Sequence, residues 1–284
     1  SIITNEAHYP YQRPPLSKGF LTGLSKQESL FFKSESYYKK NKINMLLKSQ
    51  VSSINKKKQE VTLEDGGRIK YKKLVISTGS KLNKITSKED EKIIYLNSIS
   101  NALSLKQQLS ENKSIGIVGA GYIGLEIAAT ALKMGLKTTV FEAEKRIMQR
   151  SASTDFANFI KSYHEKMGAE FKLGARAQTI EPQNDTVSIT LNDGYSANPD
   201  FVVIGVGVQA ESFIAQEAEI EFSNGIVVDE NCLTSDENIY AAGDCVNYYF
   251  SRYNSRHRLE SVQNAIQQAA IVSSSIMGET IPYT

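Results

Sequence analysis

The chain has 284 residues, 40 % of them apolar and 23 % charged, a composition typical of a folded globular protein of about two domains. Its 33 basic and 31 acidic residues give a net charge of +2, which does not favour a nucleic-acid partner. No apolar run reaches the length of about 18 residues that a membrane-spanning helix needs, so we expect no membrane association.

The two cysteines, Cys232 and Cys245, are not spaced as a C-x-x-C motif. This spacing favours neither a redox disulfide nor a zinc site, and we predict no metal centre. Reduced, half-buried thiols are the expected state, which suits a cytoplasmic protein.

The first predicted elements are a hairpin that turns at Asp65-Gly66 and a buried strand that runs from Leu74 to Gly79. Further along, the β-branched run Ser114 to Val118 predicts a second buried strand. Gly119-Ala-Gly-Tyr-Ile-Gly124 follows it at once.

A helix is predicted from Leu125 to Met134, where Gly135 ends it, and the strand Lys137 to Phe141 comes next and leads into Glu142. This order of strand, glycine loop, helix, strand and acidic residue is typical of a dinucleotide-binding unit.

Each glycine of this loop has a physical role in that chemistry. Gly119 permits the tight turn, Gly121 lets a pyrophosphate approach the backbone, and Gly124 lets helix and strand pack closely. The carboxylate of Glu142 would accept hydrogen bonds from the ribose hydroxyls of NAD and repel the 2′-phosphate of NADP. Lys145 and Arg146 leave NADPH open as an alternative, although solvent exposure is the more usual fate of such a pair.

The remaining elements continue the alternation of helices and strands. Asp155 to Met167 is predicted as an amphipathic helix, and its apolar residues on one face are Phe156, Phe159, Ile160, Tyr163 and Met167. A second hairpin turns at Asp193-Gly194, before a buried strand that ends at Gly207. The strand Asn238 to Asp244 places a carboxylate at a sheet edge, and the last helix runs from Glu260 to Met277.

The two hairpins and the strands after them form an internal repeat. Asp65 and Asp193 are 128 residues apart (193 − 65), and so are Gly79 and Gly207 (207 − 79). Coincidence between two common hairpins is the alternative. On the same offset, a counterpart of Gly119 would precede Ser1, so we expect the chain to begin about halfway through a first fold of the same kind.

Four motifs, in order along nearly the whole chain, resemble the flavin-dependent ferredoxin and rubredoxin reductases. These are NADH-dependent reductase components of bacterial dioxygenase and P450 electron chains, and apoptosis-inducing factor is a relative. The motifs are Pro10-Tyr-Gln-Arg-Pro-Pro-Leu-Ser-Lys18, Gly119-Ala-Gly-Tyr-Ile-Gly-Leu-Glu126, Ala242-Gly-Asp244 and Arg258-Leu-Glu-Ser-Val-Gln-Asn-Ala265. The first is specific to this branch, and the others are shared more widely.

The resemblance implies an α/β fold of two doubly wound, Rossmann-like, three-layer ββα domains. We expect an FAD-binding domain at residues 1–108 and 230–284, interrupted by an inserted NAD-binding domain at residues 109–229. The family's first glycine loop and its C-terminal domain, which covers part of the flavin and contributes to a homodimer, are expected to lie outside this chain. Whether the chain alone holds FAD and is active is left open.

The resemblance also implies the contacts of both cofactors. On the family pattern, FAD would contact Asn5, Arg13, Lys18, Val51, Thr78, Gly79, Asp244 and Val262. NADH would contact Gly119, Gly121, Tyr122, Ile123, Gly124, Glu126, Glu142 and Gly207. Two residues depart from the pattern at the adenosine end of FAD: Asn5 replaces a common acid, with Glu6 adjacent, and Asn97 replaces a common arginine.

The implied activity is hydride transfer from NADH to FAD, followed by single-electron transfer to a ferredoxin or rubredoxin. The wider disulfide-reductase superfamily implies that Lys18 and Glu126 form a catalytic ion pair beside the flavin, where the lysine favours the anionic reduced ring. Alternatives are a related NADH oxidase, peroxidase or disulfide reductase, and a nucleotide-binding protein without turnover. The sequence does not identify the electron acceptor.

Overall fold

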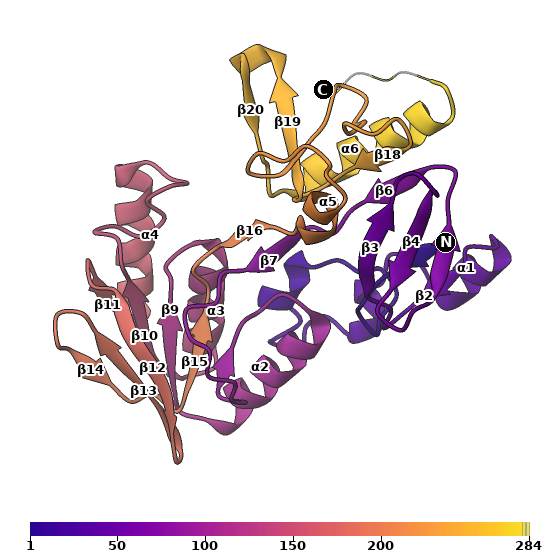
Figure 1. Ribbon diagram of the computed structural model, residues 1–284. Coiled ribbons are helices and arrows are strands. Elements are labelled where there is room, and N and C mark those ends of the chain that lie inside the picture. Colours follow the sequence, from indigo (N-terminus) through magenta and orange to yellow (C-terminus); the bar gives the residue numbers. More distant parts are fainter. Residues whose placement is uncertain (280, 282, 284) are drawn as a thin grey trace. The chain divides into compact units, whose positions relative to one another are not determined.

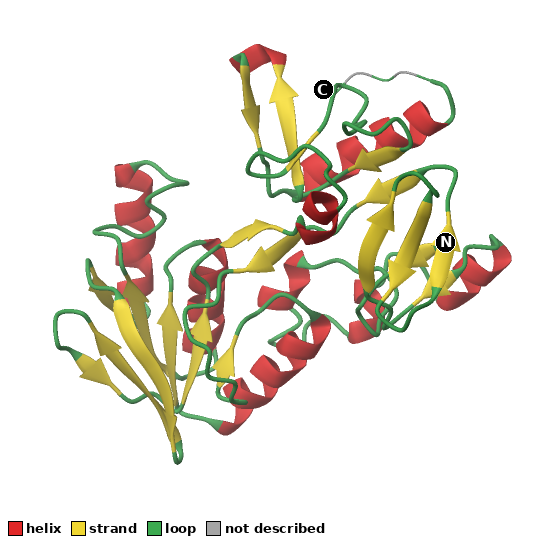
Figure 2. Cartoon of the chain, viewed as in Figure 1, coloured by secondary structure: helices red, strands yellow, loops and turns green. Residues whose placement is uncertain are grey.

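A computed structural model describes residues 1–279, 281 and 283, and its contacts divide the chain into two compact units. Unit 1 comprises residues 1–9, 34–81 and 208–284, and unit 2 comprises residues 10–33 and 82–207. Each unit interleaves helices with strands (Figure 2), so the predicted α/β class is confirmed.

Unit 2 is built on a five-stranded parallel sheet in the order β11-β10-β9-β15-β8 (Figure 1). Its strands are β8 (Ile93–Ile94), β9 (Ser114–Val118), β10 (Lys137–Glu142), β11 (Glu170–Leu173) and β15 (Phe201–Ile204). Its helices are α2 (Ile99–Glu111), α3 (Tyr122–Lys133) and α4 (Thr154–Lys166), with 3₁₀ turns η1 (Pro14–Ser17) and η2 (Gln27–Leu30). A three-stranded antiparallel sheet completes the unit: β12 (Ala177–Gln183), β13 (Thr186–Leu191) and β14 (Ser196–Ala197).

The central strands of the parallel sheet in unit 2, β9 and β15, are buried on both faces because nearly all of their residues are apolar. Side chains alternate along a strand, so Phe201 and Val203 of β15 join one core with the helices. Val202 and Ile204 join a second core with the antiparallel sheet. The result is the predicted three-layer arrangement of helices, parallel sheet and antiparallel sheet.

Unit 1 contains smaller sheets. Two pairs are parallel: β1 (Ile2–Ile3) with β2 (Met45–Leu46), and β6 (Leu74–Ile76) with β18 (Ile239–Ala241). One antiparallel sheet joins β3 (Val51–Asn55), β4 (Glu60–Leu63) and β5 (Arg68–Lys70). A separate two-stranded sheet joins β7 (Ser80–Leu82) and β16 (Val208–Ala210). The last sheet has the order β17 (Ile226–Val227), β19 (Val246–Phe250) and β20 (Ser255–His257). The helices are α1 (Glu35–Lys40), α5 (Phe213–Glu217) and α6 (Val262–Ile276), with the 3₁₀ turn η3 (Ser251–Tyr253).

The boundaries of the two units differ from the predicted domain boundaries. Residues 10–33 belong to unit 2 because Leu16, Phe20 and Leu30 are buried in the core formed with α2 and α3. Residues 82–108 belong to unit 2 as well, and residues 208–229 belong to unit 1. Which unit binds which cofactor is not decided by this packing, so the assignment of an FAD and an NAD domain stays a prediction.

The helix α4 differs from its sequence pattern in one respect. Of the five apolar residues that share a face, only Ile160 packs against the core. Four are exposed: Phe156, Phe159, Tyr163 and Met167. Beside Ile160, the buried face is formed by Ala157 and His164, which the apolar pattern does not single out.

The internal repeat led us to expect the chain to begin within a first fold, and its first strand there, β1, is short and covers only Ile2–Ile3. Both cysteines are fully buried rather than half-buried. Among the described residues, no helix combines the length and the apolar composition that crossing a bilayer requires.

Candidate functional site

The glycine loop of unit 2 lies between β9 and α3 and is as tight as its sequence predicts. A Cβ atom at Gly119 would lie 2.3 Å from the carbonyl oxygen of Gly205, and Gly119 itself has a φ of +106°. A Cβ atom at Gly124 would lie 2.0 Å from the carbonyl oxygen of Gly119. Side chains are therefore excluded at both positions by neighbouring backbone.

Gly121 has the opposite environment, because no atom lies within 4 Å of the place where its Cβ would stand. It is also the N-cap of α3, and no side chain caps the helix there. The backbone N–H groups at this end can thus be approached by an anion, as a pyrophosphate site requires. The adjacent side chains of Tyr122 and Ile123 are 59 % and 45 % exposed, and a bound dinucleotide would cover them.

Glu142 lies at the end of β10, and its carboxylate faces the glycine loop. One oxygen accepts a hydrogen bond from the backbone N–H of Ala120 at 2.7 Å, and the other accepts one from the N–H of Glu144 at 2.9 Å. Each carboxylate oxygen has a further lone pair, so acceptor capacity for a ribose hydroxyl remains.

The basic residue Arg146 has partners within its own loop. Its guanidinium donates hydrogen bonds to the backbone carbonyls of Gln149 at 3.0 Å and Ala152 at 2.9 Å. These bonds fix the segment before α4.

The predicted ion pair between Lys18 and Glu126 is present in unit 2, although 108 residues separate its members. The Nζ atom of Lys18 lies 3.0 Å from Oε2 of Glu126, and it also donates to the carbonyl of Pro14 at 3.3 Å. Sequence analysis missed a third member: the hydroxyl of Ser17 donates to the same Oε2 atom at 2.5 Å. The motif around Lys18 contains this serine and is the signal that points to it.

The ion pair is held by the packing of its two elements. Leu16 is buried beside Lys18, while Leu125 and Ile127 are buried on either side of Glu126. The apolar neighbours anchor the loop and the helix, and the charged groups remain at the surface of the unit. The side chains of Lys18 and Glu126 are 52 % and 31 % exposed, so a ligand can reach them.

Arg13 precedes this pair and is fixed by three contacts. Its guanidinium donates to the backbone carbonyl of Asn97 and to the hydroxyl of Tyr11, and it lies 5.1 Å from the centre of the Tyr11 ring. The contact with Asn97 uses the backbone, so it does not depend on the amide side chain that departs from the family pattern.

In unit 1, the ends of two parallel strands bring predicted residues together. Because Ile76 of β6 pairs with Ala241 of β18, the following residues Thr78 and Gly79 emerge at the same sheet edge as Asp244. The buried thiol of Cys245 lies between the two segments, since it donates to the carbonyls of Ile76 in β6 and of Ala242 just after β18.

The helix α6 begins beside this edge. Gly243 has a φ of +88°, and a Cβ atom there would contact Ala265 in the first turn of α6. Ser261 caps the helix by accepting a hydrogen bond from the N–H of Asn264. Val262 and Ile266 are 47 % and 63 % exposed, which leaves an apolar surface next to Asp244. A flat aromatic ring system beside a helix N-terminus fits these residues.

Gly207 ends the second copy of the repeat and has a φ of +93°. Its carbonyl accepts a hydrogen bond from the N–H of Asn83, and in the first copy the carbonyl of Gly79 accepts one from the N–H of Glu211. Asn83 and Glu211 are themselves 128 residues apart (211 − 83). The repeat offset was thus a signal that could have identified both residues.

The predicted FAD contacts divide between the two units. Arg13 and Lys18 lie in unit 2, and the others lie in unit 1: Asn5, Val51, Thr78, Gly79, Asp244 and Val262. Of these, Asn5 is exposed after β1, and Val51 begins β3. All predicted NADH contacts lie in unit 2.

Comparison with known proteins identifies the family. Residues 1–269 match the profile of the pyridine nucleotide-disulphide oxidoreductases, and the chain belongs to this family. It is 38 % identical to a rubredoxin-NAD(+) reductase of Pseudomonas putida, over 99 % of this chain and 74 % of that protein. It is 35 % identical to rhodocoxin reductase of Rhodococcus erythropolis, over 100 % of this chain and 67 % of that protein.

Comparison with solved structures supports the same family. The crystal structure of the ferredoxin reductase for the CYP199A2 system from Rhodopseudomonas palustris is similar with a TM-score of 0.93 and 35 % identity. That match covers 99 % of this chain and 70 % of the other. The covalent complex of putidaredoxin reductase with putidaredoxin is similar with a TM-score of 0.95 and 30 % identity, over 99 % and 69 % of the two chains. The recognition of the family and of its reductase branch is therefore confirmed.

Proposed function

We propose that this chain is the cofactor-binding part of an NADH-dependent flavoprotein reductase that passes electrons to a ferredoxin or rubredoxin. The ion pair of Lys18 with Glu126 is the observation that carries the proposal, because it joins the branch-specific loop to the helix of the glycine loop. The reductases named above support the reaction type, and the open backbone at Gly121 with Glu142 in unit 2 supports NADH binding there.

The residues present fit both cofactors. For NADH, the open backbone at Gly121 receives the pyrophosphate, and Glu142 receives the ribose hydroxyls. For FAD, Asp244 would bind a ribityl hydroxyl, and Val262 at the start of α6 would contact the ring. Bound FAD would supply a hydride acceptor that can also release electrons singly. The carboxylate of Glu142, which would repel a 2′-phosphate, supports NADH over NADPH.

Within this proposal, Lys18 is the residue that stabilises charge. Its ammonium is held by Glu126 and by the carbonyl of Pro14, so its position is fixed before any ligand binds. A positioned cation stabilises developing negative charge more than a mobile one, because no reorganisation is needed during the reaction. Ser17 orients the shared carboxylate oxygen of Glu126 by donating to it.

The two cysteines do not support the rival reading as a peroxidase or disulfide reductase. Burial raises the pKa of the Cys232 thiol to about 12, and burial also raises the pKa of Cys245. Reactive cysteines need a low pKa and exposure, and neither thiol has them. Both thiols are suited to a reduced compartment, and we propose a cytoplasmic location on this ground.

The visible spectrum of the purified chain tests the proposal. We expect a yellow protein, as isolated or after addition of FAD, that anaerobic NADH bleaches and NADPH bleaches far more slowly. With a rubredoxin and cytochrome c added, NADH should reduce the cytochrome only when the rubredoxin is present. A colourless chain that binds NADH but takes up no FAD would contradict the proposal and favour nucleotide binding without turnover.

The role of Lys18 is tested by Lys18→Met in the flavin-loaded protein. We expect hydride transfer from NADH to slow by at least about tenfold, because a preorganised positive charge is lost. Lys106→Met is the matched control, since Lys106 lies over the ring of Phe20 in the same unit. Stopped-flow bleaching of the flavin measures both rates, and equal rates in Lys18→Met and wild type would remove this role.

A further inference from the structure

The helix α4 presents a continuous apolar stripe to solvent. Phe156, Phe159, Tyr163 and Met167 are 52 %, 65 %, 58 % and 56 % exposed. Their spacing of three, four and four residues places them on one side of the helix, one above the other. Large apolar side chains that are exposed singly are ordinary, but four in a row on one helix indicate a surface that another molecule covers.

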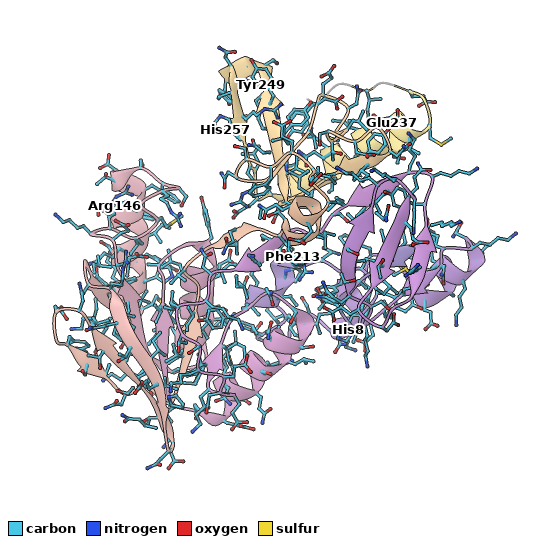
Figure 3. All side chains as sticks on the ribbon, viewed as in Figure 1. His8, Arg146, Phe213, Glu237, Tyr249 and His257 are labelled. Atoms are coloured by element: carbon cyan, nitrogen blue, oxygen red, sulfur yellow. The ribbon has the colours of Figure 1, made fainter. Side chains whose placement is uncertain are left out.

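The stripe is held outward by the other contacts of the helix. His164 is buried, and its ring nitrogens lie 3.2 Å from the carbonyl oxygen of Leu125 in α3 and 2.9 Å from that of Ile160. Arg146, labelled beside α4 in Figure 3, fixes the segment that leads into the helix. Rotating α4 to bury the stripe would break these contacts, so the exposure is a property of the folded unit.

The pattern of the stripe is self-complementary. Two copies of α4 that pack antiparallel across a two-fold axis bring Phe159 of each copy against Tyr163 of the other. In an antiparallel pair of helices, residues that face each other have nearly equal sums of residue numbers. The sum for Phe156 with Met167 differs by only one from the sum for Phe159 with Tyr163, so the same arrangement also brings Phe156 against Met167. An isologous contact requires this property, since one surface must match its own rotated image.

The charges beside the stripe fit the same arrangement. Asp155 lies in the first turn of α4 and Lys166 in the last, and both are exposed. Eleven residues are close to three full turns, so the two groups lie along the same edge of the stripe. In the antiparallel pair, Asp155 of each copy therefore meets Lys166 of the other, and the two helix dipoles oppose each other favourably.

We propose that α4 is an interface through which two copies of this chain associate as an antiparallel, two-fold dimer. The contact consists of four apolar side chains and one charged pair from each copy. This is smaller than the surface of roughly 1,600 Å² that stable complexes bury, so the association is weak and depends on concentration. The proposal concerns unit 2 alone and does not depend on which reaction the protein catalyses.

Sedimentation velocity on the whole chain, from micromolar to submillimolar concentration, tests the association. The weight-average mass of the wild type should rise with concentration, and Phe159→Asp should keep the chain monomeric throughout. Phe213→Asp is the matched control, because Phe213 (Figure 3) is an exposed phenylalanine at the start of α5, 57 % exposed in unit 1. A wild type that stays monomeric, or an equal effect of both variants, would overturn the proposal.

A charge swap tests the register without altering the apolar stripe. Asp155→Lys and Lys166→Asp should each weaken association, because each places like charges opposite one another at both ends of the contact. The double variant should restore it to the level of the wild type. If the double variant is as weak as the single variants, the antiparallel arrangement is wrong.

A cross-linking experiment gives a readout that a folding defect would not imitate. The variant with Asp155→Cys and Lys166→Cys should form a covalent dimer under a mild oxidant, with each disulfide joining two chains. A disulfide within one chain is excluded because about 16 Å of helix separates the two positions. Each single variant should give far less dimer, and equal yields from single and double variants would refute the register.

Discussion

The two copies of the repeat fold into the same turn but into different sheets. In the first copy the N–H of Gly67 donates to the side chain of Asp65 at 2.8 Å, and in the second the N–H of Tyr195 donates to Asp193 at 3.0 Å. The turn glycines Gly66 and Gly194 have φ values of +87° and +89°. At this level the copies are equivalent, because the turn depends only on a few adjacent residues.

The strands that follow the two turns differ in burial. β15 lies between β9 and β8, and all four of its residues are buried. β6 pairs with β18 alone among the described strands, and Val75 is 39 % exposed. Its counterpart at an offset of 128 residues is Val203, which is 1 % exposed. Similar apolar sequences thus give a central strand in one unit and a half-covered strand in the other, since the neighbouring strands decide burial.

Mutation of this matched pair of valines should give the largest difference in lost stability between the two copies. Val203→Ala should destabilise unit 2 by about 2–3 kcal/mol, because it leaves a cavity in a close-packed core. Val75→Ala should cost unit 1 less than about 1 kcal/mol, since its side chain is already partly in water. Hydrogen exchange of the amides in each unit measures the two effects separately. Equal losses would show that the two strands are equally buried in solution.

A smaller difference in stability between the copies is expected from Asp200, whose counterpart in the first copy is Lys72. Burial raises the pKa of Asp200, but hydrogen bonds from Lys113 and Ser114, with the charge of Lys92, hold the pKa below its ordinary value of 3.8. A lowered carboxyl pKa means that the folded unit favours the ionised form. This stabilisation is present above pH 3.8 and is lost as the pH falls through the folded pKa.

We therefore expect unit 2 of Asp200→Asn to be less stable than wild type by about 1–2 kcal/mol at neutral pH, because two charge-assisted hydrogen bonds weaken. The difference should vanish in acid, once the wild-type carboxyl is protonated. Lys72→Asn is the matched control in unit 1 and should show no such convergence with pH. Exchange rates measured from neutral pH down through the folded pKa check this, and a difference that persists once the wild-type carboxyl is protonated would contradict it.

The smallest expected effects come from the turns, where the copies should behave alike. Gly66→Ala and Gly194→Ala should each cost about 1 kcal/mol, because a side chain is strained at positive φ. No atom lies within 4 Å of either Cβ position, so no steric contact adds to this cost. Exchange of the amides in β4 and β13 measures the two costs. A clear inequality would mean that the surrounding sheet, not the turn alone, sets the conformation.

Much of the candidate site was predictable because its residues follow one another closely in the sequence. The glycine loop and Glu142 lie in a single strand–helix–strand unit, whose local spacing predicts its geometry. The pair of Lys18 with Glu126 was reached only through a resemblance, since no local rule joins residues so far apart. Ser17 was missed for the same reason: its bond to Glu126 exists only after the loop packs on α3.

The sequence alone determined the strand–helix–strand unit of the glycine loop, the helices α4 and α6, the two glycine turns, the repeat and the family, because each depends on short-range spacing or on motifs in order. Only the tertiary structure decided which chain segments pack into which unit and which face of α4 is buried. Residues 10–33 join unit 2 through Leu16, Phe20 and Leu30, and His164 rather than the aromatic stripe turns inward. Both outcomes depend on contacts between segments distant in the chain, which hydrophobic periodicity does not specify.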